Sequence, residues 1–494
     1  MRGRSVGLAV LGVLAVLAAA CAPPAEVTWS TFPDSDQALV VPAPTPVNGP
    51  LRIDGDSLVD ADGRAVVLRG TNLVHKSEPY LAPTTSQPTP AGWPEVFDGD
   101  DFAYLHEMGF NAVRLGVWYR ELVPEVGVID TDYLDRVDEV VSTFEDNGIY
   151  VLLDFHQDVF HGMPPWATTD AAAALSDAAP EFLEAIGWAA AYMSPRSLRQ
   201  WADLLTDVDT ATTPGVSMWD ALAQGVTAMA QRFEGRANVA GIEVLNEPFP
   251  GIDYVRCILG GCPDVEARLS AGYDKVLDAV RVVAPTMPIW LEPVISAPHY
   301  GDTSMAAPDD DGVGFAWHAY CSGTDGGELE PVGAFEEARC NLMMDTAHDR
   351  VAQRGAAWGA PTLMTEFGAS LNPLDVNLVT TKADRRVGSW LYWAYGYTRT
   401  DQSDSALSRL YPEATAGVPV SLRFDRFTGH GTYRYTASDD GGTTVLSIPS
   451  RHYPDGYDVV VTGGTVVSPP DVPDLVIEAP PGSDVTVTVS RRAG

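Results

Sequence analysis

The chain has 494 residues, of which 45% are hydrophobic, and its formal net charge at pH 7 is −36. This acidity argues against binding to nucleic acid and against electrostatic docking on anionic lipid, because both need clusters of Lys and Arg. The length suits two domains, since one large barrel alone takes up roughly 250 to 400 residues.

The first 21 residues have the pattern of a secretory signal peptide. Arg2 and Arg4 precede an apolar run over 6–20 that is too short for a membrane-spanning helix. The run ends in a segment similar to a bacterial lipoprotein box, so lipidation at Cys21 and ordinary cleavage near Ala20 both stay open. We expect a Pro-rich tether over 22–50 and a mature protein that is secreted or lipid-anchored on the outer face of the cell envelope.

Eight apolar segments alternate with helical patterns between residues 51 and 412. Apolar runs of this length predict strands buried on both faces, and eight of them alternating with helices predict a (β/α)₈ barrel. In the helix expected over 133–147, apolar side chains recur on one face and Asn147-Gly148 provides a stop signal. The expected strands cover 66–74, 112–117, 150–155, 239–245, 287–294, 313–319, 361–367 and 389–395.

An insertion rich in Ala, Trp and Met follows the third expected strand, over about 164–218. Two interpretations of it are open: a helical elaboration packed on the barrel rim, or an apolar lid that receives an apolar substrate or touches a bilayer. Its large apolar side chains are Trp166, Trp188, Tyr192, Met193 and Trp201.

Four cysteines follow Cys21 and form two close pairs in sequence. In an exported protein, this parity favours local disulfides between Cys257 and Cys262 and between Cys321 and Cys340. The two pairs do not share a spacing, which disfavours a zinc site. We therefore expect no metal and no cofactor.

Beyond residue 412 the pattern changes to short alternating segments separated by Gly, Pro and Asp. This predicts a small β-sandwich over 413–494, with strands near 418–424, 432–437, 443–448, 457–461, 475–479 and 485–489. We expect it to brace the barrel, with carbohydrate or lipid binding as an alternative.

Two of the expected barrel strands run into a carboxylate. Residues 239–245 are followed by Asn246, Glu247 and a proline, and residues 361–367 contain Glu366. Burying an ionisable group at a strand end is costly unless the group is paired or functional. The carboxyl ends of parallel barrel strands share one cleft, so this pair is a candidate acid and base.

Other polar groups lie at the ends of the remaining strands, and the whole set resembles glycoside hydrolase family 5, the cellulase-like retaining glycosidases. The resemblance spans about residues 51–410. It implies that Glu247 is the general acid/base and Glu366 the nucleophile, that Asn246 holds a sugar 2-hydroxyl, and that Tyr320 orients Glu366. It also implies that Arg114 keeps the nucleophile anionic, that His318 bonds to Glu247, and that Trp393 stacks on a sugar. The residues that carry the match are Arg114, His156, Asn246, Glu247, His318, Tyr320, Glu366 and Trp393.

Within that family, segments 72–76 and 152–160 and the C-terminal sandwich look like those of the endoglycoceramidases. This resemblance implies a glycosphingolipid substrate, cut between oligosaccharide and ceramide, with Lys76 and Asp158 bonded to the glucose next to ceramide. It also implies peripheral contact with a lipid surface. We expect a monomer that binds no nucleic acid.

Three alternatives remain. A polysaccharide endoglycosidase such as a cellulase or mannanase would use the same two carboxylates in a long open groove. A glycosidase that prefers glucosyl- or galactosylceramide would differ only in its pocket. A catalytically inactive lipid-binding module would keep the fold without turnover.

Overall fold

The structure is a computed structural model that describes residues 46–82, 97, 99–180, 190–295, 303–320, 334–369, 373–395 and 401–492. The predicted signal peptide, Cys21 and most of the predicted tether lie outside the described residues. Among the residues that are described, no helix has both the length and the apolar composition needed to cross a membrane.

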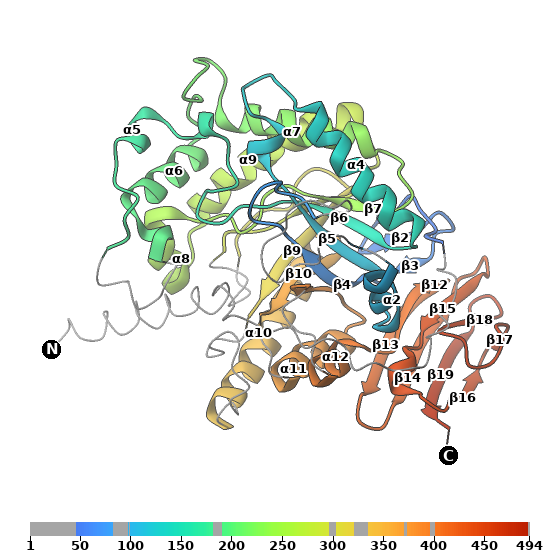
Figure 1. The fold of residues 1–494 in the computed structure, drawn as a ribbon. Helices are drawn as coiled ribbons and strands as arrows, with labels where there is room; N and C mark the ends of the chain where they lie inside the picture. Colours follow the sequence, from blue (N-terminus) through green and yellow to red (C-terminus); the bar gives the residue numbers. More distant parts are fainter. Residues whose placement is uncertain are drawn as a thin grey trace.

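Eight parallel strands form a closed barrel, which confirms the predicted (β/α)₈ fold (Figure 1). The last strand, β11, pairs with the first, β4, through Trp390 and Arg69, and this pairing completes the ring. The barrel strands are β4 (Arg69–Leu73), β5 (Ala112–Val117), β6 (Tyr150–Phe155), β7 (Val239–Glu243), β8 (Ile289–Leu291), β9 (Val313–Ala319), β10 (Thr362–Gly368) and β11 (Ser389–Trp393).

Helices cover the outside of the barrel. The helix α4 (Thr131–Asp146) begins where the Asp130 side chain accepts a hydrogen bond from the Tyr133 N–H, and it buries the apolar face that the sequence predicts. The other helices that follow barrel strands include α2 (Gly99–Glu107), α3 (Tyr119–Leu122), α7 (Met218–Phe233), α9 (Pro263–Val283), α10 (Ala334–Trp358), α11 (Pro373–Asp384) and α12 (Asp401–Leu407).

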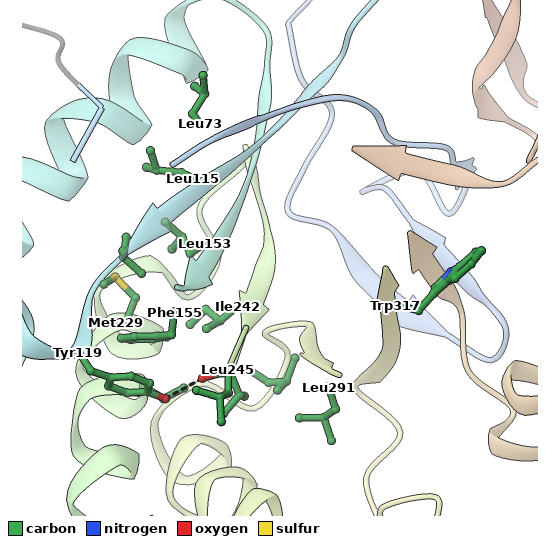
Figure 2. Close-up of a cluster of buried hydrophobic side chains, with 14 of the residues drawn as sticks. Leu73, Leu115, Tyr119, Leu153, Phe155, Met229, Ile242, Leu245, Leu291 and Trp317 are labelled. Atoms are coloured by element: carbon green, nitrogen blue, oxygen red, sulfur yellow. Dashed lines mark hydrogen bonds between the residues drawn. The ribbon is translucent and has the colours of Figure 1, made fainter. Parts of the chain in front are cut away.

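Side chains on the barrel strands alternate between two environments. Those that face the helices form the main core, to which Leu115, Leu153 and Ile242 of the strands and Met229 of α7 belong (Figure 2). The Tyr119 hydroxyl also donates to the carbonyl of Val244 in this region, at 2.8 Å.

The side chains that face the barrel interior form a second cluster at its lower end, which includes Ala112, Leu152, Trp290, Ala316 and Leu391. Residues two positions apart on a strand point to the same side. On each strand, the residue two positions further along is therefore also directed inward, and it lies closer to the carboxyl end of the barrel. These positions hold Arg114, Asp154, Glu292, His318 and Trp393.

The aromatic side chains of the insertion that the structure describes are packing residues. Trp166, Tyr192 and Trp201 are at most 1% exposed, and Trp201 packs against Phe160 and Phe249 with ring centroids 5.3 and 6.3 Å apart. Their burial favours the interpretation of the insertion as a helical elaboration packed on the barrel, and Trp188 lies outside the described residues. The insertion contains η1 (Pro165–Ala167), α5 (Asp170–Ala173) and α6 (Pro195–Leu205).

The C-terminal strands form two antiparallel sheets that share an apolar core. One sheet has the order β13 (Gly417–Asp425), β14 (His430–Ala437), β19 (Asp484–Arg491) and β16 (Tyr457–Thr462). The other has the order β1 (Arg52–Asp54), β2 (Ser57–Val59), β3 (Ala65–Val66), β12 (Tyr411–Thr415), β15 (Thr443–Ser447), β18 (Asp474–Glu478) and β17 (Thr465–Val466).

The N-terminal strands of this sheet differ from the prediction, which assigned residues from 51 onward to the barrel and one strand to 66–74. In the structure β3 pairs with β12, so that Val66 lies opposite Ala414, and the chain enters the barrel only at Arg69. The reason is that the Val67 N–H donates to the carbonyl of Glu413, at 3.1 Å, and keeps this segment in the sheet.

The disulfide between Cys257 and Cys262 is present and links α8 (Tyr254–Gly260) to the start of α9. A one-turn helix, η3 (Gly251–Asp253), precedes α8. Cys340 is also disulfide-bonded, whereas Cys321 lies outside the described residues.

Candidate active site

Glu247 and Glu366 lie together at the carboxyl end of the barrel, and both are 2% exposed. Glu366 belongs to β10, whereas Glu247 lies four residues beyond the end of β7 with a φ of 44°. Oxygen atoms of the two carboxylates and a nitrogen of His318 all lie within 4.8 Å of one another. Carboxyl groups about 5 Å apart suit direct attack on a sugar carbon, whereas insertion of a water needs a spacing above about 6.5 Å.

The Glu366 carboxylate receives two hydrogen bonds. Arg114 Nη1 donates to Oε1 at 2.6 Å and the Tyr320 hydroxyl donates to Oε2 at 2.7 Å. Both contacts were expected from the sequence. Donors of this kind stabilise a carboxylate in its ionised form, as a nucleophile requires.

Arg114 contacts several other polar side chains of the site. Its guanidinium contacts Asp154 at 3.0 Å and Glu243 at 2.7 Å, and it donates to the side-chain oxygens of Asn72 and Asn246 at 2.9 and 2.8 Å. Burial lowers the pKa of Arg114, but the surrounding carboxylates outweigh burial and raise it well above its usual value. The guanidinium is therefore charged throughout.

Glu247 has a different environment from Glu366. Its Oε1 lies 2.9 Å from His318 Nδ1, and its backbone N–H donates to Glu292 Oε2 at 2.7 Å. Burial raises the pKa of Glu247 to about 7, and the negative charge of Asp158 adds to the effect. Burial lowers the pKa of His318 to about 4, so this ring is neutral near pH 7.

The predicted sugar-binding residues form a connected group beside this pair. Lys76 Nζ lies 2.6 Å from Asp158 Oδ2, which in turn lies 3.3 Å from His156 Nε2. Burial lowers the pKa of His156, but Asp154 and Asp158 outweigh it and raise the pKa to about 9. The Lys76 side chain is 40% exposed, so this end of the group is open to solvent.

Trp393 belongs to the same group and is 4% exposed. Its ring is stacked on His156 with centroids 5.5 Å apart, and the Lys76 ammonium lies 4.6 Å from its centroid. Asn246 lies nearby, and its side-chain amide donates to the carbonyl of Gln157 at 2.9 Å. The structure thus brings all ten predicted site residues to the carboxyl end of the barrel.

Sequence reasoning missed three buried carboxyl groups of the site, namely Asp154, Glu243 and Glu292. All three are 0% exposed, and burial raises the pKa of Glu243 to about 7. The signal was available, because an ionisable residue within or just after a strand buried on both faces needs a partner. Asn72 and Gln157, which bond to Arg114 and to the backbone near Glu247, were missed as well.

Within the described part of the chain, two groups of side chains have the spacing of metal ligands. They are Glu243, Glu292 and His318, and Glu247, His318 and Glu366, with ligand atoms within 4.8 Å of one another in each group. Each group contains a carboxylate, Glu243 or Glu366, that already accepts a hydrogen bond from the positively charged Arg114 guanidinium.

Comparison with known families agrees with this geometry. Residues 59–399 match the model of the cellulase family, glycosyl hydrolase family 5. The chain belongs to glycoside hydrolase family 5. Residues 409–489 match the model of the family 5 C-terminal domain, so the relationship extends over both parts of the protein.

Within family 5 the chain is similar to endoglycoceramidases, as the sequence motifs indicated. Endoglycoceramidase I of Rhodococcus hoagii is 33% identical over 89% of this chain and 88% of the relative. An endoglycoceramidase of Cyanea nozakii is 26% identical over 82% of this chain and 85% of the relative. The solved structure of endo-glycoceramidase II from Rhodococcus sp., in complex with a cellobiose-like isofagomine, has a TM-score of 0.71 and 25% identity, and it covers 88% of this chain and 100% of its own.

Proposed function

We propose that this protein is a retaining endo-β-glycosidase that hydrolyses the linkage between oligosaccharide and ceramide in glycosphingolipids. Glu247 acts as acid/base and Glu366 as nucleophile. The observation that carries the mechanism is the close approach of two buried carboxyl groups in opposite environments. Glu366 is bound by a guanidinium and a phenol, whereas burial raises the pKa of Glu247 to about 7. The substrate is inferred from the similarity of the chain to endoglycoceramidases.

The reaction runs in two steps. Glu366 attacks the anomeric carbon as Glu247 passes its proton to the glycosidic oxygen, and ceramide leaves as a neutral alcohol. Glu247, now ionised, then takes a proton from water as that water attacks the same carbon and releases Glu366. His318 Nδ1 lies within hydrogen-bonding distance of Glu247 and can stabilise the ionised carboxylate between the steps.

The group formed by Lys76, His156, Asp158 and Trp393 is suited to the sugar next to ceramide. The charged pair of Lys76 and Asp158 offers a donor and acceptors to sugar hydroxyls, and an indole is the usual partner of an apolar sugar face. The solved structure of endo-glycoceramidase II is a complex with a cellobiose-like isofagomine, which supports a sugar-like ligand for this chain as well.

The test is to incubate the protein with a ganglioside in mild detergent and to analyse the products by mass spectrometry. Intact free oligosaccharide together with ceramide, both lost in Glu247→Gln and Glu366→Gln, would establish the reaction and the substrate class. Free monosaccharide with a shortened glycolipid would contradict the endo mode. Activity on cellulose or mannan without cleavage of the ganglioside would contradict the lipid substrate.

Activity on a glycolipid should decline at alkaline pH with an apparent pKa near 7. Glu247 must be protonated to release ceramide, and its raised pKa of about 7 means that the proton is present below this pH and lost above it. We expect kcat/KM to fall about tenfold per pH unit on the alkaline side. An aryl β-lactoside with a dinitrophenol leaving group needs no proton, so its kcat/KM should lack this decline, and an identical decline for both substrates would contradict the assignment.

We further propose that the protein meets its substrate at a lipid surface through η3 and α8, which follow directly after Glu247. Ile252 and Leu259 are 77% and 66% exposed, and Val255 lies between them on the same helical face. Arg256 is paired with Asp253 and Asp264 at 3.0 and 2.7 Å, so local charge is balanced and the contact is apolar. The Cys257–Cys262 disulfide supports a secreted or lipid-anchored location, because disulfides persist in oxidising compartments.

The double variant Ile252→Ser with Leu259→Ser should lose activity on glycolipid embedded in vesicles and keep it in detergent micelles. Burying one such side chain contributes about 1.5 to 3 kcal/mol, so we expect a loss of at least about tenfold in vesicle binding. The matched control is Val418→Ser with Val460→Ser, because these side chains are 66% and 65% exposed on the C-terminal sheet, away from α8 (Figure 1). Equal sedimentation of both double variants with phosphatidylcholine vesicles containing ganglioside would contradict the docking surface.

A further inference from the structure

Glu292 lies one residue beyond β8 and faces the barrel interior, where it is 0% exposed. One of its carboxyl oxygen atoms contacts Glu247 directly, and the other faces His318, which in turn contacts Glu247. Oε2 accepts a hydrogen bond from the Glu247 N–H at 2.7 Å. Oε1 lies 3.6 Å from His318 Nδ1, the ring nitrogen that also lies 2.9 Å from the Glu247 carboxyl.

Glu247 needs such a partner because its backbone is strained. A φ of 44° lies in the left-handed region, which costs a residue with a side chain about 1 to 3 kcal/mol. The ladder between β7 and β8 ends at Glu243 and Trp290, and the Val244 N–H then makes one more bond to the carbonyl of Trp290. Beyond this point the Glu247 N–H bonds to the side chain of Glu292 instead of to the backbone of a neighbouring strand.

Glu292 can hold this position without adding charge to the site. Burial raises its pKa well above the usual value, and the nearby Glu243 and Glu247 raise it further. A protonated carboxyl still has a carbonyl oxygen that accepts the Glu247 N–H. It can therefore remain next to Glu247 when that residue becomes ionised after it gives up its proton.

We propose that Glu292 is the positioning residue for the acid/base: by holding the Glu247 N–H and facing the same nitrogen of His318, it fixes the direction of the Glu247 carboxyl toward the glycosidic oxygen. The inference rests on the proposed role of Glu247. It assigns to Glu292 a function in proton transfer without contact with the substrate.

Substrates with different leaving groups test this role. In Glu292→Leu, which has a similar volume but no acceptor, kcat/KM for ganglioside should fall about 10²-fold, because misplacement of a catalytic group by about 1 Å costs this much. For a dinitrophenyl β-lactoside, which needs no acid, it should fall by less than about threefold. Glu292→Gln keeps the acceptor oxygen and should remain within about threefold of the unmodified protein on both substrates.

The matched control is Glu266→Leu. Glu266 is also buried, at 3% exposure, and its carboxylate accepts hydrogen bonds from the Thr303 hydroxyl and the Ser304 N–H, both at 2.5 Å, and neither partner is a site residue. A loss of packing alone should affect both substrates equally there. Equal losses on both substrates in Glu292→Leu, or no loss, would overturn the proposal. Glu292→Ala gives the same comparison if the leucine variant does not fold.

The companion variant Glu247→Ala separates this inference from the proposed function. It should also lose ganglioside cleavage selectively. If Glu247→Ala affects both substrates equally, the acid/base assignment itself is wrong. If Glu247→Ala is selective and Glu292→Leu is not, only the role of Glu292 is wrong.

Discussion

Glu366→Gln is expected to lose turnover of ganglioside and of activated aryl lactosides alike, by on the order of 10⁴-fold or more, because an amide cannot form the covalent glycosyl ester. The substitution keeps the shape of the side chain and an oxygen that can accept from Arg114 Nη1 or from the Tyr320 hydroxyl. Folding should therefore be preserved, and the loss should be confined to the chemical step.

The measurement pairs kinetics with trapping of the intermediate. A 2-deoxy-2-fluoro lactoside with a good leaving group should label the unmodified protein with one sugar unit on the peptide that contains Glu366, and it should leave Glu366→Gln unlabelled. The control is Glu413→Gln in β12, a strand outside the barrel, where burial raises the pKa of a carboxyl to about 8. That variant should keep full activity. A label on any other peptide would contradict the assignment of the nucleophile.

Arg114→Met is expected to have the largest effect on stability among single substitutions in the site. It leaves Asp154, Glu243 and Glu366 buried without the cation that now lies within 3.0 Å of each of them. Removing one partner from a buried ion pair costs about 3 to 5 kcal/mol. Activity should be lost as well, because the nucleophile loses its strongest donor.

The pH dependence of that destabilisation has a defined sign. Carboxyl groups that are buried without a cation have folded-state pKa values above those of the unfolded chain, and the pKa of Glu243 is already about 7 with Arg114 present. Their contribution to the free energy of unfolding is therefore most favourable at low pH, and it is lost as the pH rises through the folded-state pKa. Urea unfolding at pH 5 and pH 8 should show the larger deficit at pH 8. Arg52→Met, which removes an exposed ion pair with Asp54, should cost less than about 1 kcal/mol at either pH.

The features that could be predicted from the sequence are those with a repeated physical pattern. Strands buried on both faces produce continuous apolar runs, so the eight barrel strands were found, and the carboxylates at two of their ends identified the cleft. The position of Glu292 just after a buried strand indicates that it needs a partner, but the sequence does not reveal that this partner is a backbone N–H of Glu247. That contact depends on the left-handed turn at Glu247, which a non-glycine sequence does not indicate.

The aromatic insertion and the N-terminal strands show two other limits. A cluster of Trp and Tyr has the same composition whether it packs inside or faces a ligand, and only the contacts of Trp201 with Phe160 and Phe249 decide between them. The strands β1 to β3 are two or three residues long, and β3 pairs with a strand about 350 positions away, so no local pattern signals their partner.

The pairing of β3 with β12 also limits how early the protein can fold during its synthesis. A ribosome releases the chain from its N-terminus, so β1 to β3, over residues 52–66, can pair with one another early but cannot join the rest of their sheet until residues 411–415 have been made. Contacts of such long sequence separation form slowly and leave strand edges exposed in the meantime. The strand β12 thus covers the edge of β3. A protein expressed without its last eighty or so residues would expose this strand edge to other protein molecules.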